Sequence, residues 1–92
     1  MSKVTIARMV VKPESVSRFV ELANTLVTNT NEESGCEVYK FYQEVGNASS
    51  FIFYEEYQDQ VALDFHFNST YLKTFLDNTK DYLIGEVQLK VF

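Results

Sequence analysis

The order in which hydrophobic spacing changes along the chain restricts the fold more than any other feature of the sequence. A strand-like run of apolar and β-branched residues at 4–11 precedes a stretch at 16–30 in which apolar residues recur every three or four positions. Two more strand-like runs follow at 36–45 and 51–57, then a second helical stretch and a last strand-like run. This order, β-α-β-β-α-β, predicts a ferredoxin-like α+β fold with two helices on one face of a four-stranded antiparallel sheet.

Capping and turn residues mark the expected ends of these elements. Pro13 ends the first strand and permits a helix start, and Gly35 stands where the C-cap of the first helix is expected. The segment 46–50, with the sequence GNASS, predicts the turn of a β-hairpin. The remaining signals are helix caps at Asp59 and Ser69, a helix interruption at Asn68-Ser69, a helix stop at Gly85 and a last strand at 86–92.

The length and the apolar content predict one domain that associates with a second copy. We expect a single domain over residues 1–92. Hydrophobic residues make up 46% of the chain and aromatic residues 15%, a heavy apolar load for this length. Both faces of the strands are apolar, as where Ile6 and Val10 alternate with Ala7 and Met9. Because helices cover only one face, we expect a homodimer in which the other faces of two sheets meet.

Charge and residue usage argue against several classes of partner. The formal net charge is −5 and the eight Lys and Arg residues are scattered, so nucleic acid is not expected as a partner. No apolar stretch approaches the ~20 residues of a membrane span, and the N-terminal sequence predicts a strand instead of a signal peptide. The single cysteine fits a reducing, cytoplasmic compartment. Without a Cys/His cluster or clustered glycines, we expect neither a metal site nor a bound cofactor.

The only histidine of the chain marks the predicted pocket. His66 lies between Phe65 and Phe67, downstream of an aromatic strand that carries Glu55 and Glu56. Imidazole is the side chain whose charge most readily changes near neutral pH. An aromatic pocket with few polar groups suits a flat organic molecule better than a sugar, a phosphate or a nucleic acid.

Each of these residues also has a purely structural interpretation. His66 could act as a general base or as a hydrogen-bond donor to a phenolic oxygen, or it could simply close the pocket and bond to Glu55. Glu55 could orient His66 and favour its charged form, or it could form an ion pair with Arg8 or a lysine on a neighbouring strand. The tyrosines could bind the polar edge of a substrate, or they could be core residues with only the hydroxyl near water.

Several motifs occur in an order that identifies a family. They are Lys12-Pro13, Glu33-Ser34-Gly35-Cys36, Tyr39, Phe53-Tyr54-Glu55-Glu56-Tyr57, Ala62, His66, Ser69 and Phe75. Together they cover nearly the whole chain, which resembles the antibiotic biosynthesis monooxygenase (ABM) family of dimeric α+β barrels. That family includes cofactor-independent quinol and anthrone-type monooxygenases, heme-degrading enzymes, and an isomerase branch that processes a phosphorylated autoinducer.

The resemblance implies which residues form the site. Glu55 corresponds to the family's acid on the third strand and His66 to its histidine on the second helix, so these two are the expected catalytic residues. The expected substrate-binding residues are Tyr39, Phe53, Tyr57, Phe65 and Tyr71. Two of these depart from the family pattern, since Tyr57 stands where Trp is common and Tyr71 where a second histidine often occurs.

Three functions are compatible with this resemblance. The first is a cofactor-independent monooxygenase acting on a small aromatic or quinone-like substrate. The second is an isomerase of a small, oxygenated and possibly phosphorylated metabolite, and the third is a dimer that binds a small molecule without turnover. Heme degradation is disfavoured, because that branch uses Asn, Trp and His where this chain has Ala7 and Arg8, then His66, then Leu76.

Overall fold

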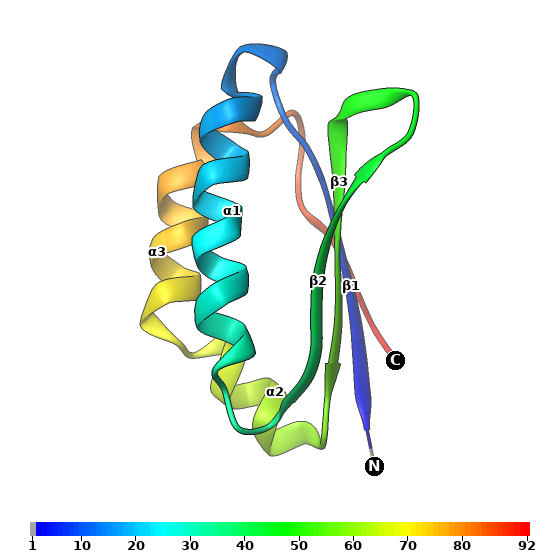
Figure 1. Ribbon diagram of the computed structural model, residues 1–92, viewed down its shortest axis with the longest axis vertical. Coiled ribbons are helices and arrows are strands. Elements are labelled where there is room, and N and C mark those ends of the chain that lie inside the picture. The colour runs from blue at the N-terminus through cyan, green and yellow to red at the C-terminus, as the bar shows by residue number, and fades with distance from the viewer. Residues whose placement is uncertain (1) are drawn as a thin grey trace.

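A computed structural model describes residues 2–92 and confirms the predicted ferredoxin-like α+β fold, with its four-stranded antiparallel sheet. Figure 1 shows two long helices side by side over one face of the sheet, with a short helix at one end. The elements in chain order are β1 (Lys3–Val10), η1 (Pro13–Ser15), α1 (Val16–Asn31), β2 (Cys36–Glu44), β3 (Asn47–Tyr57), α2 (Gln60–Phe67), α3 (Thr70–Thr79), η2 (Lys80–Tyr82) and β4 (Gln88–Val91).

The strand register decides which side chains face the helices. The strand order is β2-β3-β1-β4, and all neighbouring strands are antiparallel. Ala7 in β1 is paired with Phe53 on one side and Leu89 on the other, so these residues share one face. Glu55 is two residues beyond Phe53 and therefore lies on the same, helix-facing side of the sheet.

Aromatic contacts hold α1 against the sheet. Phe19 of α1 is fully buried, and its ring centroid lies 5.2 Å from that of Phe51 and 5.7 Å from that of Phe75. Phe41 and Phe51 stack with centroids 5.1 Å apart. Buried rings at such distances add attraction to the area that they remove from water. This cluster fixes the separation of helices and sheet and so creates the space for a cavity beside it.

Gly35 has a different role from the expected helix cap. The residue after α1 is Glu32, and among residues 2–92 only Gly46 and Gly85 have positive φ angles. A Cβ on Gly35 would lie 2.4 Å from the Cβ of Ala62 in α2. Glycine is therefore required because α2 packs directly against the turn between α1 and β2, and this packing brings Glu33 next to α2.

The predicted ends of the elements are partly confirmed. The Asp59 carboxylate accepts the Ala62 N–H at 2.9 Å, and the helix breaks at Asn68 as expected. Ser69 Oγ accepts the Leu72 N–H at 3.4 Å and begins α3. The hairpin turn is tighter than predicted, because β3 begins at Asn47.

The prediction that the last helix continues to Gly85 is wrong. Helix α3 ends at Thr79, one 3-10 turn follows, and β4 begins at Gln88. The Lys12 N–H donates to the Tyr82 carbonyl at 2.8 Å, and the Ile84 N–H donates to the Val10 carbonyl at 2.7 Å. The chain around Leu83 therefore bonds to the end of β1 in place of continuing the helix.

Candidate functional site

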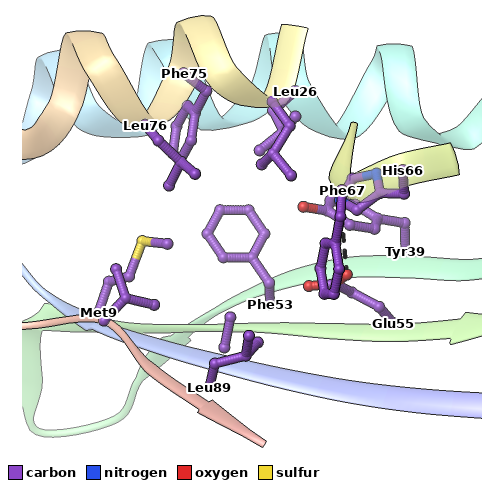
Figure 2. A pocket seen from close by; sticks show the side chains of 13 residues that line it. Met9, Leu26, Tyr39, Phe53, Glu55, His66, Phe67, Phe75, Leu76 and Leu89 are labelled. Atoms are coloured by element: carbon purple, nitrogen blue, oxygen red, sulfur yellow. Dashed lines mark ion pairs between the residues drawn. The ribbon is translucent and has the colours of Figure 1, made fainter. Parts of the chain in front are cut away.

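A cavity of about 270 Å³ lies between the sheet and the helices. Its walls are mostly apolar and include Met9, Leu26, Phe53, Phe75 and Leu89. Three lining residues carry polar groups in their side chains: Tyr39, Glu55 and His66. Figure 2 shows these three together on one side of the cavity, while Met9 and Leu76 lie on the other side. The cavity therefore has one polar end and one apolar end.

His66 occupies the last turn of α2 between two carboxylates. Its side chain is 1% exposed, and its two ring nitrogens face different acids. Nδ1 lies 3.0 Å from Glu33 Oε2, and Nε2 lies 3.8 Å from Glu55 Oε1. Because a carboxylate only accepts hydrogen bonds, Nδ1 carries the ring proton of a neutral imidazole and Nε2 has a free lone pair. The basic nitrogen of His66 is thus the one on the side of Glu55.

The sequence spacing predicts that Val61, Ala62 and Phe65 lie with His66 on the pocket-facing side of this helix, and the structure confirms this only for Ala62 and His66. Val61 is 77% exposed and Phe65 is 64% exposed, whereas the buried residues of α2 are Ala62, Leu63 and His66. The aromatic neighbours of the imidazole are Tyr39, Tyr57 and Phe67, with ring centroids 5.3, 5.4 and 6.0 Å away. His66 is therefore held by rings from the sheet together with the Glu33 hydrogen bond.

Glu55 faces the cavity, and Glu56 faces away. Glu55 is 3% exposed, and its Oε1 accepts a hydrogen bond from the Tyr57 hydroxyl at 2.7 Å. Glu56 points to the opposite side of the sheet, where its carboxylate accepts a hydrogen bond from Tyr54. The alternative of an ion pair between Glu55 and Arg8 is wrong, because Arg8 is on that outer face and contacts Gln88 at 3.4 Å.

Burial sets the protonation of both cavity groups. It raises the pKa of Glu55 from 4.5 to about 7, with a further upward contribution from the charge of Glu33 and an opposing one from the Tyr57 hydrogen bond. Burial lowers the pKa of His66 below its ordinary 6.5, although the hydrogen bond and charge of Glu33 oppose this. The net effect on His66 therefore favours the neutral ring, because desolvation outweighs the attraction of the neighbouring acids for a charged one. Near neutral pH, His66 is a neutral base beside a carboxyl group that is close to its midpoint.

Glu33 is the site residue that the sequence prediction missed. Its side chain is 4% exposed, and Oε2 accepts hydrogen bonds from His66 Nδ1 and from the Tyr71 hydroxyl. Its Oε1 is buried without a hydrogen-bond partner among residues 2–92. One signal was available, because Glu33 continues the helical spacing of the buried α1 residues. Those residues are Phe19, Ala23, Leu26 and Thr30.

The structure separates the five expected substrate-binding residues into two groups. Tyr39 and Phe53 line the cavity. Against expectation, Tyr57, Phe65 and Tyr71 do not line it. Tyr57 lies behind Glu55 and is fully buried, Tyr71 lies beyond Glu33, and Phe65 points outward from α2. Burial raises the pKa of Tyr39, so its hydroxyl stays protonated and can donate a hydrogen bond to a cavity ligand.

Two kinds of feature are absent from the part of the chain that the structure describes. Within residues 2–92, no group of three or more His, Cys, Asp and Glu side chains is arranged to hold a metal ion. None of the helices in this range combines the length and the hydropathy that crossing a membrane requires.

Comparison with known sequences assigns the family. Residues 3–78 match the sequence model of the family described as antibiotic biosynthesis monooxygenase. The chain belongs to this family. The matched segment contains Glu33, Glu55 and His66, so the three interacting groups of the site all come from the part of the chain that the ABM model covers.

Individual relatives agree with the ABM assignment. The protein sll1783 of Synechocystis is 32% identical over 82 residues, which are 89% of this chain but only 56% of that protein. The Bacillus subtilis protein named "Putative monooxygenase YcnE" is 30% identical over 73 residues, 79% of this chain and 77% of its own length. A solved structure from Methanosarcina mazei Go1, titled a conserved protein, superimposes with a TM-score of 0.95 at 30% identity and covers 100% of this chain and 91% of that chain.

Proposed function

We propose that this ABM-family protein is a monooxygenase that acts on a small, flat aromatic substrate with a hydroxyl group, of the quinol or anthrone type, without a tightly bound cofactor. The observation that carries the proposal is the neutral imidazole of His66, held between two buried carboxyl groups at the polar end of an apolar cavity. A cavity of about 270 Å³ suits a small ligand, since pockets for drug-sized molecules are typically ~300–1,000 Å³.

The reaction begins with a proton transfer at the polar end of the cavity. His66 Nε2 takes a proton from the substrate, and the ionised Glu55 carboxylate stabilises the imidazolium that forms 3.8 Å away. The electron-rich substrate anion then reduces dioxygen directly. One oxygen atom enters the substrate, which loses two hydrogens, and these hydrogens leave with the second oxygen atom as water.

The rest of the cavity positions the substrate and excludes water. Phe53 offers an aromatic face, and the Tyr39 hydroxyl can donate to a substrate oxygen. Apolar walls strengthen the electrostatic interactions at the polar end, because little solvent screens them. In this proposal His66 and Glu55 are the catalytic residues, and Tyr39 and Phe53 contact the substrate.

Oxygen consumption tests the proposal. The purified protein is expected to consume dioxygen with members of a panel of quinols and anthrones, and ¹⁸O₂ should add one labelled atom to the product. Uptake no faster than in a sample without protein, for every compound of the panel, would exclude this function.

An isomerase is the second candidate, because the same two groups could move protons on a substrate without dioxygen. Conversion of a substrate under anaerobic conditions would favour it. A phosphorylated substrate is not supported, since no Lys or Arg is among the cavity-lining residues of the described chain.

We also propose that the protein forms a homodimer through the outer face of its sheet. Tyr42 and Ile52 are 54% and 37% exposed on this face, next to Ile6 and Val10. Burying such a surface against a second copy removes apolar area from water. Light scattering is expected to give twice the mass of the chain, and Ile52→Lys is expected to shift the protein toward the monomer. A wild-type protein that remains monomeric at micromolar concentration would rule out this assembly.

A further inference from the structure

The His66 ring connects the cavity to a carboxylate that lies outside it. Glu55 lines the cavity, but Glu33 does not. The imidazole therefore has Nε2 toward the cavity side and Nδ1 toward a second acid behind it, at 3.0 Å. A ring placed in this way can accept a proton on one nitrogen and release a different proton from the other.

Beyond Glu33, the hydrogen bonds continue to the surface of the protein. The Tyr71 hydroxyl donates to Glu33 Oε2, the same oxygen that His66 contacts. Tyr71 is only partly buried and lines a hollow between α1 and α3. This hollow also carries hydroxyl and amide side chains, from Thr25, Asn29, Thr70, Thr74 and Asn78. The chain of bonds thus leads from the cavity to a hollow at the surface of the protein that carries hydroxyl and amide groups.

We infer that Glu33 and Tyr71 form a proton relay that links the buried His66 to solvent on the side of the helices. The relay rests on the proposed function, in which His66 takes a proton from a substrate that itself fills the cavity and blocks exchange through it. Glu33 and Tyr71 touch neither substrate nor cavity, so they act through His66 as positioning and relay residues.

The transfer balances without any electron transfer. His66 Nε2 gains the substrate proton, and Nδ1 gives its own proton to Glu33 Oε2. The Tyr71 hydroxyl, which donates to Glu33 at rest, first turns its hydrogen toward water. Glu33 then passes its proton to the Tyr71 oxygen while the hydroxyl hydrogen moves to water, so Tyr71 never becomes a phenolate. His66 later returns the Nε2 proton to the departing oxygen. A proton then moves in the reverse direction, from water through Tyr71 and Glu33, and restores the proton on Nδ1.

Other titratable groups near the imidazole do not offer this route. Glu55 faces the cavity, and the Tyr57 hydroxyl ends on Glu55. Tyr39 is 2% exposed and lines the cavity. The remaining alternative is direct exchange from Glu33 itself, which also borders a hollow beside the α1–β2 turn.

The substitution Tyr71→Phe separates these routes, because it removes the hydroxyl and keeps the ring. The readout is the exchange of the His66 Nδ1 proton with water, followed by NMR of ¹⁵N-labelled imidazole; the chain has one histidine, so the signal is unambiguous. We expect exchange to slow by about tenfold, the rate equivalent of one lost hydrogen bond. Tyr82→Phe is the matched control, since the Tyr82 hydroxyl takes no part in this network and its loss should leave the exchange rate unchanged.

The sign of the change distinguishes a relay from a structural contact. If Tyr71 only braced Glu33, its loss would loosen the site and speed exchange; faster or unchanged exchange in Tyr71→Phe therefore overturns the relay. The measurement needs no substrate. If exchange slows in Tyr71→Phe but the wild type consumes no dioxygen, the relay stands and the oxygenase proposal falls. If the wild type consumes dioxygen but exchange does not slow in Tyr71→Phe, the oxygenase proposal stands and the relay falls.

Discussion

Replacing His66 by alanine is expected to lower the rate of oxygenation by ~10²–10⁴-fold, the usual contribution of a general base. The substitution removes the basic Nε2 from the polar end of the cavity and leaves Glu33 and Glu55 in place. The rate is measured as dioxygen uptake with a substrate from the quinol and anthrone panel. Circular dichroism and light scattering establish whether the variant keeps the fold and the assembly of the wild type.

The matched control for this experiment is Val61→Ala in the same helix. Val61 is 77% exposed and does not line the cavity, so the control should retain the wild-type rate. Wild-type turnover by a folded His66→Ala protein would reduce His66 to a packing residue. The base would then have to be the Glu55 carboxylate.

The substitution Glu55→Gln is expected to lower kcat/KM by about 10²-fold and to change its dependence on pH. In the wild type, burial raises the pKa of Glu55 to about 7, so the carboxylate that stabilises the imidazolium forms only as the pH rises through that value. The wild-type kcat/KM should therefore climb with pH and level off above about 7. The amide variant cannot ionise at this position, so its kcat/KM should not show this rise with pH. If kcat/KM of Glu55→Gln still rises with pH near 7, the titration belongs to another group.

The same substitution is expected to stabilise the fold at high pH. The carboxyl group of Glu55 has an ordinary pKa of 4.5 and a folded value of about 7, so the folded state binds more protons between these two values. The free energy of unfolding therefore falls as the pH rises through this window, by up to about 3 kcal/mol. His66 acts in the opposite direction, because its lowered folded pKa makes stability rise with pH through the region below 6.5. Urea unfolding of both proteins at pH 4.5 and 8 would show whether Glu55→Gln gains stability only at the higher pH.

The sequence predicted most of the fold because local signals and long-range packing agree there. The caps at Asp59 and Ser69 are formed, and the order of hydrophobic spacing matches the order of strands and helices. The extension of the last helix to Gly85 failed because main-chain bonds from β1 capture the chain near Leu83. Those bonds join residues far apart in sequence, so no local sequence pattern predicts them.

The parts of the candidate site that depend on residue type could be predicted from the sequence. The parts that depend on which face of a helix is buried, or on tertiary contacts, could not. A unique histidine and an acid on an aromatic strand indicated His66 and Glu55. Phe65 was misplaced because α2 has only eight residues, too few to fix the direction of its apolar stripe. Glu33 was missed because its contact with His66 depends on tertiary packing: Gly35 allows the turn between α1 and β2 to approach α2.

Two residues of the apolar wall of the cavity lie outside the part of the chain that matches the ABM family model. Glu33, Glu55 and His66 lie within residues 3–78, the segment that matches the ABM family model. Val87 and Leu89, which help to form the apolar wall, lie beyond that segment, and Leu89 at the start of β4 is half exposed. Substitutions at Val87 and Leu89 are expected to change the shape of the apolar wall while Glu33, Glu55 and His66 stay in place. The range of molecules that fit the cavity is therefore expected to change at these two positions without any change in the acid–base groups.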